Sequence, residues 1–423
     1  MDYKIKKEDL HVLEKFLRYV KINTQSDEAS ETFPSTKHQF DLANLLVKEL
    51  KELGLEDAHV DEYCYVYATL PSNLDEEIKD KVPPIGFIAH LDTYPEVSGK
   101  DVKPILHENY DGKDIVLPGE EDQVIKVSEN PKLKDFIGDT IITSDGTTLL
   151  GADDKAGIAE IMAAVEYMVK HPEFKHPTVK IAFTPDEEVG QGTKYFDVKK
   201  FGVKYAYTMD GGYPGEVENE TFCADSAIVT VKGKDVHPGY AKNKLVNAVR
   251  AASYFITLFK EDSLPETTEG KEGYVHPYQI NGNVSEVKIT TLLRDFEIEG
   301  LKEKRKWIED WAKKTEEKFP GVKVEVEIKE YYRNMKYKIM EDPKVLNYAI
   351  EAVKRAGLKP VTKPIRGGTD GATLCYMGVL TPNIFAGGMN FHSKQEWVAL
   401  KSMKLAAEVI LHILRVWTEN SSK

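Results

Sequence analysis

The sequence predicts an α/β protein of two domains, with the second and smaller domain inserted into the first. Three observations lead to this prediction. The chain has 423 residues, which is too long for one typical hydrophobic core. Up to Gly215, helical and strand patterns alternate as they do in α/β architectures. From Phe222 to Tyr331 the order becomes strand, helix, strand, strand, helix, strand, which is the plan of a ferredoxin-like α+β domain.

The elements of the first part follow from hydrophobic periodicity. Apolar residues recur at helical spacing over residues 8–20 and 40–53, and again after Asp154. Short apolar runs bounded by polar residues predict strands. The predicted strands cover residues 63–70, 85–89, 179–183 and 205–209.

The inserted part is predicted in the same way. Its strands cover residues 227–231, 274–280, 284–296 and 322–328, its helices cover residues 245–259 and 301–318, and residues 262–273 form a loop. From Asp342 the helix and strand alternation returns, and it ends in an amphipathic helix over residues 399–417. We therefore expect a main domain in two pieces, residues 1–218 and 333–423, around an inserted domain of residues 219–332.

Charge and cysteine content exclude several classes of protein. Acidic residues outnumber basic ones by 70 to 57, which argues against nucleic acid as a partner, because phosphate binding needs clustered Lys and Arg. Three scattered cysteines fit neither a disulfide framework nor a paired-cysteine zinc site, and they suit a reducing compartment. The first residues, MDYKIKKEDLHVLEKF, lack the uninterrupted apolar core of a signal peptide, and no stretch of the sequence approaches the apolar length of a membrane helix. We expect a cytoplasmic protein that binds neither nucleic acid nor membrane.

The strongest local motif is an apolar strand that leads into His90 and Asp92. The two residues stand at positions i and i+2, so their side chains leave the strand on the same side. A carboxylate placed there could orient the imidazole and fix its tautomer, as a metal-ligating histidine requires. A strand-end histidine that is simply hydrogen-bonded to the aspartate fits the motif equally well.

A second motif places two acids side by side at the start of a predicted helix. Asp153 and Asp154 follow Gly151 and precede Lys155. A helix N-cap explains one acid, because it satisfies free backbone N–H groups and interacts well with the helix dipole. It does not explain two.

Further acids and a histidine complete the set of candidates. Asp186, Glu187 and Glu188 follow the strand over residues 179–183, and adjacent carboxylates repel one another unless a cation lies among them. A solvated loop is the simpler interpretation of such a run, but strand ends in open α/β sheets are where sites form. Asp210 stands at another strand end, and His392 lies near the C-terminus.

Two imidazoles and several carboxylates make a ligand set that suits zinc, manganese or cobalt. One metal ion needs only three or four of these ligands. The surplus favours two ions that share a bridging carboxylate, as in co-catalytic hydrolases.

Seven motifs, taken together, carry a family resemblance. In chain order they are HLDT, LLGADDKAG, FTPDEEVGQG, YTMDGG, VHPGYAKN, PIRGGTDGA and GGMNFHSKQE. The chain resembles, over nearly its whole length, the dizinc exopeptidase family that includes carboxypeptidase G-like enzymes, aminoacylases and succinyl-diaminopimelate desuccinylase. The resemblance implies an α/β catalytic domain with a mixed sheet flanked by helices, an inserted ferredoxin-like lid and dimerisation domain, and two zinc ions per subunit.

The resemblance also assigns metal ligands to positions of this sequence. His90 and Asp210 match the ligands of one ion, and Glu188 and His392 match those of the other. Asp153 matches the carboxylate that bridges the two ions.

Three further features of the site are implied by the same motifs. Asp92 matches the acid that supports His90, and Glu187 matches the general base that takes a proton from the attacking water. The peptide bond between Asp153 and Asp154 is cis in this family.

Four candidates for substrate binding come from the inserted domain and its surroundings. By resemblance, His237 stabilises the oxyanion and reaches the other subunit in dimeric members, although the residues alone favour a turn histidine before Pro238. Arg366 is a candidate for the terminal carboxylate of the substrate, because a guanidinium binds a carboxylate with two hydrogen bonds. Asn243 and Arg294 are further candidates that are equally well explained as structural residues.

The motifs PIRGGTDGA and VHPGYAK match, in detail, family members that remove the N-terminal residue from short peptides, tripeptides in particular. Two alternatives stay open. One is an N-acyl-amino-acid deacylase or a carboxypeptidase of the same family. The other is a dimeric metal-binding protein without catalysis, which inert residues in place of Glu187 or Asp92 would favour, and the sequence has neither replacement.

Overall fold

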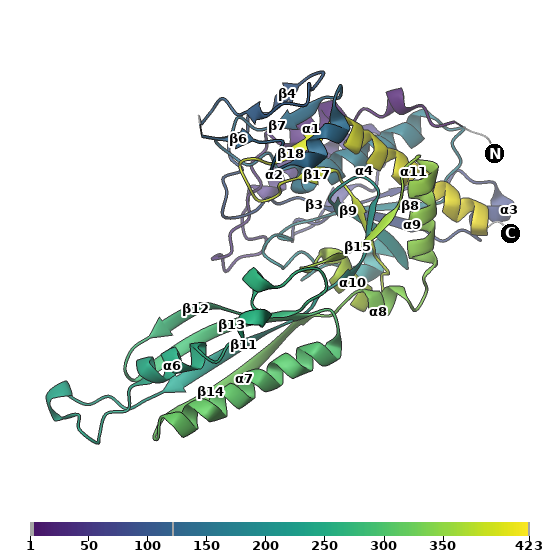
Figure 1. Cartoon of the computed structure of the whole chain (residues 1–423). Coiled ribbons are helices and arrows are strands. Elements are labelled where there is room, and N and C mark those ends of the chain that lie inside the picture. The colour runs from purple at the N-terminus through teal and green to yellow at the C-terminus, as the bar shows by residue number, and fades with distance from the viewer. Residues whose placement is uncertain (1–3, 121, 422–423) are drawn as a thin grey trace. The chain divides into compact units, whose positions relative to one another are not determined.

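A computed structural model describes residues 4–120 and 122–421 of the chain (Figure 1). These residues form two compact units. The first unit comprises the chain up to Asn219, Tyr337–Lys363 and the chain from Thr369 onward. The second comprises Glu220–Lys336 together with the short segment Pro364–Gly368, whose place in this unit we did not anticipate.

An eight-stranded mixed sheet runs through the first unit, in the order β1-β2-β8-β3-β9-β16-β10-β15. Its strands are β1 (His59–Val60), β2 (Val66–Leu70), β3 (Ile85–His90), β8 (Val179–Thr184), β9 (Tyr205–Gly211), β10 (Glu216–Thr221), β15 (Val361–Ile365) and β16 (Asn383–Phe385). β3 is parallel to β8 and β9, whereas β2 is antiparallel to β8. The predicted mixed α/β sheet is confirmed.

The first unit also contains helices. They are α1 (Val12–Tyr19), α2 (Gln39–Glu52), α3 (Glu76–Lys79), α4 (Ala152–Lys170), α5 (Val198–Phe201), α8 (Lys336–Ile339), α9 (Lys344–Arg355), α10 (Asp370–Tyr376) and α11 (Leu400–Ser421). α4 packs on β3 and β9, and α1 and α11 pack on α4. At Gly157 a Cβ would lie 2.0 Å from the carbonyl oxygen of Met209, so glycine is required for α4 to lie this close to β9. Within the described part of the chain, no helix is both long and apolar enough to cross a membrane.

A small sheet in the first unit was not predicted. Its order is β17-β18-β7-β4, formed by β4 (Ile105–His107), β7 (Ile141–Thr143), β17 (Gly388–Met389) and β18 (Trp397–Ala399), and a separate ribbon pairs β5 (Ile115–Val116) with β6 (Val124–Ile125). Trp397 is fully buried in the apolar cluster beneath β18. The antiparallel hairpin of β17 and β18 therefore has a rigid base, and its loop contains His392.

The second unit is an antiparallel sheet with two helices. The strands β11 (Cys223–Lys232), β12 (Tyr274–Gly282), β13 (Glu286–Asp295) and β14 (Lys323–Tyr332) pair in the order β12-β13-β11-β14. α6 (Ala248–Ile256) and α7 (Ile298–Lys318) pack on this sheet. This order is that of a ferredoxin-like domain, which confirms the predicted α+β plan.

The central sheet gathers several strand ends at one edge. Because β3, β8 and β9 are mutually parallel neighbours, their carboxyl ends lie together. In the β3–β8 register His90 pairs with Thr184. Ligand sites form at this edge of open α/β sheets.

Candidate active site

His90, the last residue of β3, is the buried centre of a polar cluster. Its side-chain Nε2 lies 2.9 Å from Oδ1 of Asp153 and 3.7 Å from Oδ1 of Asp210. Its Nδ1 lies 3.0 Å from the backbone carbonyl oxygen of Asp92 and 3.4 Å from the Asp92 carboxylate. Asp92 therefore holds Nδ1 of this imidazole and leaves Nε2 to face the other acids, as in metal-ligating histidines.

Asp153 lies between the two histidines. Its Oδ1 faces His90, and its Oδ2 lies 3.2 Å from Nε2 of His392. The same His392 nitrogen lies 2.9 Å from Oε2 of Glu188. Five residues that are distant in sequence thus converge, with the Asp153 carboxylate shared between two groups of neighbours.

The donor set fits divalent metal ions. His90 forms one group with Asp154 and Asp210 and a second with Asp153 and Glu188, and the ligand atoms within each group lie within 4.8 Å of one another. Oε1 of Glu188 is buried and has no hydrogen-bond partner among the described residues, so a cation would satisfy it. Imidazole nitrogens and carboxylate oxygens are ligands that zinc accepts.

The electrostatics of the cluster favour added positive charge. Burial lowers the pKa of His392, but the carboxylates of Asp153 and Glu188 outweigh burial and raise that pKa to about 10. Burial, together with the Asp153 charge, raises the pKa of Glu188 to about 8. The cluster therefore retains protons at neutral pH, and metal binding would release them.

Asp92 holds the segment that carries the two glutamates. Its Oδ1 accepts a hydrogen bond from the backbone N–H of Glu187 at 2.9 Å, and its Oδ2 accepts one from that of Glu188 at 3.1 Å. Burial and the nearby Asp210 charge raise the pKa of the Glu187 carboxyl well above its ordinary value. A carboxyl with a raised pKa, next to a candidate metal cluster, suits a general base.

The three consecutive acids after β8 have different roles. Asp186 is buried, and its carboxylate accepts hydrogen bonds from the backbone N–H of Ser35 at 2.6 Å and from Nε2 of Gln39 at 2.7 Å. Asp186 therefore ties the loop after β8 to residues 35–39, whereas Glu188 faces His392.

The pairing of Asp153 with Asp154 also has a structural explanation. The Asp154 carboxylate accepts hydrogen bonds from the backbone N–H groups of His90 at 3.1 Å and Gly157 at 3.3 Å. The peptide bond between the two acids is cis. One acid of the pair thus faces the histidines, and the other connects the start of α4 to the end of β3.

Sequence reasoning missed Glu396. This buried carboxylate accepts hydrogen bonds from the backbone N–H groups of Leu150 (2.8 Å) and Gly151 (2.7 Å) through Oε2, and from that of Asp153 (2.9 Å) through Oε1. It stands four residues after His392 in the motif GGMNFHSKQE. That position in a quoted motif was the available signal, since the backbone N–H groups that bond its carboxylate lie 243 to 246 positions away in the sequence.

Two more buried groups near the cluster were also not assigned. Lys155 donates a hydrogen bond to the carbonyl oxygen of Ile22 at 2.7 Å, and burial lowers the pKa of its ammonium group to about 7. Asp370 accepts a hydrogen bond from the Thr184 hydroxyl at 2.7 Å, and burial raises its pKa to about 7.

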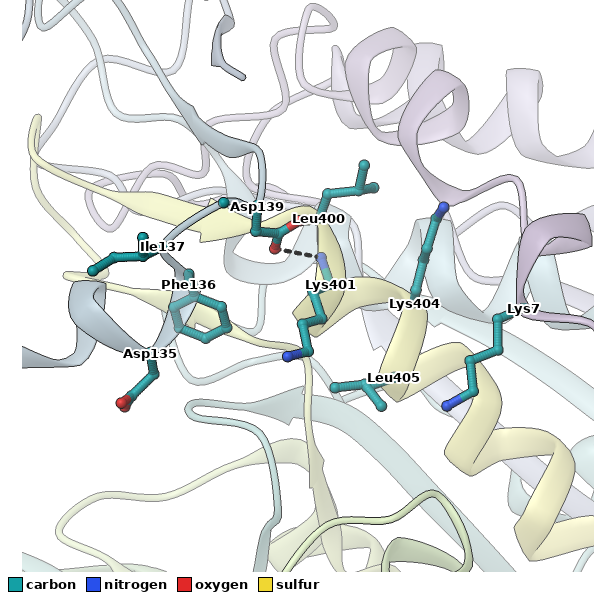
Figure 2. Close-up of a pocket in the computed structure, with 10 residues that line it drawn as sticks. Lys7, Asp135, Phe136, Ile137, Asp139, Leu400, Lys401, Lys404 and Leu405 are labelled. Carbon is teal, nitrogen blue, oxygen red and sulfur yellow. Dashed lines mark hydrogen bonds between the residues drawn. The ribbon is translucent and has the colours of Figure 1, made fainter. Parts of the chain in front are cut away.

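A cavity of about 800 Å³ opens beside His392, and Glu96, Asn130 and Lys394 are among its lining residues. It provides space for a small ligand next to the cluster. A second cavity, of about 390 Å³, is lined by Phe136 and by three lysines of the N-terminal segment and α11 (Figure 2). None of the predicted site residues lines that second cavity.

The predicted substrate-binding residues lie in the second unit. Arg294, on β13, donates hydrogen bonds to the backbone carbonyls of Asp225 and Leu293. His237 is exposed and accepts a hydrogen bond from the backbone N–H of Gly239. Asn243 is exposed in a left-handed backbone conformation, with φ of 62°.

Arg366 has partners within its own unit. Its guanidinium donates hydrogen bonds to the carbonyl oxygens of Gly270 and Glu272 and to the hydroxyl of Thr268, and it lies 5.3 Å from the ring centre of Phe222. These contacts hold the loop over residues 268–272, a role that the sequence did not indicate. Binding of a substrate carboxylate by Arg366 stays a prediction.

Comparisons with known proteins agree with this geometry. Residues 143–416 match the model of peptidase family M20/M25/M40. Over 413 residues the chain is 50% identical to peptidase T of Listeria monocytogenes, covering 98% of this chain and 99% of that protein.

Solved structures give the same fold. The chain is similar to an aminopeptidase, PepT, from Bacillus cereus, with a TM-score of 0.75 at 23% identity. It is equally similar to a tripeptidase from Staphylococcus aureus, with a TM-score of 0.75 at 24% identity, and in both cases 98% of this chain and 99% of the other are covered. The motif resemblance, which pointed within its family to peptidase T, is confirmed. The chain belongs to peptidase family M20/M25/M40 and, within that family, to the peptidase T group of hydrolases.

Proposed function

We propose that this protein removes the N-terminal residue from tripeptides and that two zinc ions, bound by His90, Asp153, Glu188, Asp210 and His392, are required. The observation that carries the proposal is the position of Asp153, whose two carboxylate oxygens face different histidines. A carboxylate so placed can bridge two ions. Manganese or cobalt could replace zinc with the same ligands.

The ions would supply Lewis acidity, lowering the pKa of a bound water and polarising a carbonyl oxygen. The chain supplies the remaining groups. Asp92 orients His90 and holds the backbone of Glu187 and Glu188. Glu187 accepts the proton of the attacking water and returns it to the leaving amine.

The substrate would occupy the cavity beside His392, with its scissile carbonyl at the ions. We assign His237 to the oxyanion and Arg366 to the C-terminal carboxylate of the peptide, with Asn243 and Arg294 as further contacts. A guanidinium suits a carboxylate through two parallel hydrogen bonds.

We also propose a domain arrangement, an oligomeric state and a cellular compartment for this protein. We assign the catalytic domain to residues 1–218 and 333–423 and the lid to residues 219–332, and we expect a homodimer formed through the lid. The buried free thiols of Cys64, Cys223 and Cys375 suit a reducing compartment, so we infer a cytoplasmic protein whose partners are short peptides rather than nucleic acid or membrane.

One product analysis tests the proposal against its alternatives. The zinc-loaded protein is incubated with a free tripeptide and with its N-acetylated form, and the products are identified by mass. We expect the N-terminal residue to be released from the free peptide only. Release of acetate would indicate a deacylase, and release of the C-terminal residue a carboxypeptidase. No cleavage by protein that holds two ions would favour the metal-binding protein without catalysis.

A further inference from the structure

The two histidines of the cluster are supported in different ways. The side chain of His90 is 2% exposed, and its Nδ1 faces Asp92. The side chain of His392 is 41% exposed, and no described group hydrogen-bonds its Nδ1. His392 also has a left-handed backbone, with φ of 60°, in the loop of the β17–β18 hairpin. A ligating histidine normally has a partner that fixes its ring, so His392 needs another kind of support.

Tyr94 provides an aromatic surface against this ring. The two ring centres are 4.0 Å apart, and the ring planes differ by 5°. The Tyr94 hydroxyl donates a hydrogen bond to Glu96 at 3.1 Å, so it does not hold His392. The contact between the two residues is therefore between ring faces.

The backbone around Tyr94 is held on both sides. Thr93 forms a β-bridge with Gln25, and the Thr93 carbonyl accepts a hydrogen bond from the backbone N–H of Ser26 at 3.0 Å. The carbonyl of Pro95 accepts a hydrogen bond from the Gln25 side chain at 2.6 Å. The proline ring further restricts the chain. Tyr94 is thus a fixed surface. The loop that carries His392 has hydrogen bonds of its own, from the Asn390 side chain to the Gln395 carbonyl at 3.1 Å and from the Ser393 hydroxyl to the Asn390 carbonyl at 2.7 Å, but these bonds do not contact the imidazole.

We propose that Tyr94 is a positioning residue, which holds the imidazole of His392 by stacking so that Nε2 faces Glu188 and Asp153 before a metal ion arrives. The inference rests on the proposed function, because it takes His392 as a metal ligand. Its physical basis is preorganisation: a ring that is already in the ligating rotamer loses less freedom on binding.

The size of the effect is limited by the stacking energy. Since stacking acts on the metal-free protein, its loss weakens metal binding by no more than the stack itself contributes, on the order of 2- to 12-fold in Kd. We expect Tyr94→Ala to raise the Kd of one of two zinc ions by such a factor, measured by titrating zinc into metal-free protein. Tyr94→Phe keeps the ring, loses only the hydroxyl, and should match the wild type.

A spectroscopic measurement reports the geometry directly. In cobalt-loaded protein, the visible absorption bands should shift or broaden in Tyr94→Ala and return in Tyr94→Phe. Tyr195→Ala is a matched control, because Tyr195 also stacks on a ring, that of Tyr63, at 4.3 Å and 12°. Tyr94→Leu, which keeps apolar bulk, replaces the Ala variant if that variant does not fold.

The outcomes distinguish the positioning role of Tyr94 from the metal-ligand role of His392. His392→Ala should lose one ion, and if it retains both, the ligand assignment itself is wrong. If His392→Ala loses one ion while Tyr94→Ala binds both ions like the wild type, only the positioning role is overturned. A Phe variant as weak as the Ala variant would also overturn it, because the hydroxyl rather than the ring would then be responsible.

Discussion

Replacing Glu396 with Gln should loosen the segment that carries Asp153 without removing any proposed ligand. The Glu396 carboxylate accepts hydrogen bonds from the backbone N–H groups of Leu150, Gly151 and Asp153, at 2.8, 2.7 and 2.9 Å. A glutamine side chain has only one acceptor oxygen. With that oxygen in the Oε2 position, two hydrogen bonds survive and the amide NH2 faces the N–H of Asp153.

The magnitude follows from this geometry. The reverse orientation of the amide would lose two bonds, so the lowest cost is one buried N–H left without an acceptor, about 1–3 kcal/mol. If the lost hydrogen bond lowers the free energy of local opening of the segment by this amount, amide hydrogen exchange in the segment accelerates by about 5- to 150-fold. The same loosening should weaken metal binding, since Asp153 is the proposed bridge.

Hydrogen exchange followed by mass spectrometry of metal-free protein measures this directly. The peptide that spans residues 150–153 should exchange faster in Glu396→Gln, with little change in the second unit. Glu218→Gln is the control, because Glu218 is also buried in the first unit, and its carboxylate accepts a hydrogen bond from the Asn383 side chain at 3.2 Å rather than from residues 150–153. Unchanged exchange over residues 150–153 in a folded Glu396→Gln protein would refute the reasoning.

Three further predictions concern other carboxyl groups. Glu187→Ala should retain both metal ions by elemental analysis but lose about 100- to 10,000-fold in kcat, the typical contribution of general-base catalysis, and a near-normal kcat would exclude Glu187 as the base. Burial raises the pKa of Glu160 well above 4.5, so the unfolded state alone loses this proton as the pH rises. The wild type should therefore lose stability relative to Glu160→Gln above pH 4.5, by about 1.4 kcal/mol per pH unit until the folded pKa is reached, and parallel unfolding curves against pH would contradict this. Burial opposes the shift at Glu220, but hydrogen bonds from Lys271 and Lys336 lower its pKa. The stabilisation that Glu220 contributes is therefore present above pH 4.5 and lost as the pH falls through the folded pKa, so Glu220→Gln should cost about 1 kcal/mol at neutral pH and nothing in acid, measured by denaturant unfolding.

The longer helices and strands were predictable from the sequence because a long segment repeats its hydrophobic period several times. The strand that ends at His90 and the strand that leads to Asp210 are continuous apolar runs, as expected for strands buried on both faces. Their parallel arrangement then brings the two side chains to one edge. The ferredoxin-like order of the second unit was predictable for the same reason.

The small sheet was not predictable. Its strands are two or three residues long, and a run of that length has no measurable period. This sheet places the hairpin that carries His392, so the second half of the candidate site could be inferred only from motif resemblance. The contact between Glu396 and Leu150 joins residues 246 positions apart, and no local pattern reports such a contact.

The run of Asp186, Glu187 and Glu188 shows a second limit. Three acids of nearly the same chemistry are indistinguishable by composition, and their roles depend on the direction in which the backbone presents each one. Asp186, with φ of 56°, turns back to residues 35–39. The other two are held by Asp92, which is itself placed by β3.

Several carboxylates of the site differ in what they contact. Asp92, Asp154 and Glu396 each accept two or three backbone N–H groups, and these bonds fix the segments that carry the histidines and Asp153. Burial nevertheless raises the pKa of Asp154 well above its ordinary value and that of Glu396 to about 7, so these hydrogen bonds position the segments without keeping either group fully charged at neutral pH. Asp153 and Glu188 face imidazoles instead, and Oε1 of Glu188 has no partner among the described groups. Asp210, whose Oδ1 lies 3.7 Å from Nε2 of His90, is the third carboxylate that we propose as a ligand. The number of ions that the site binds should therefore depend on Asp153, Glu188 and Asp210.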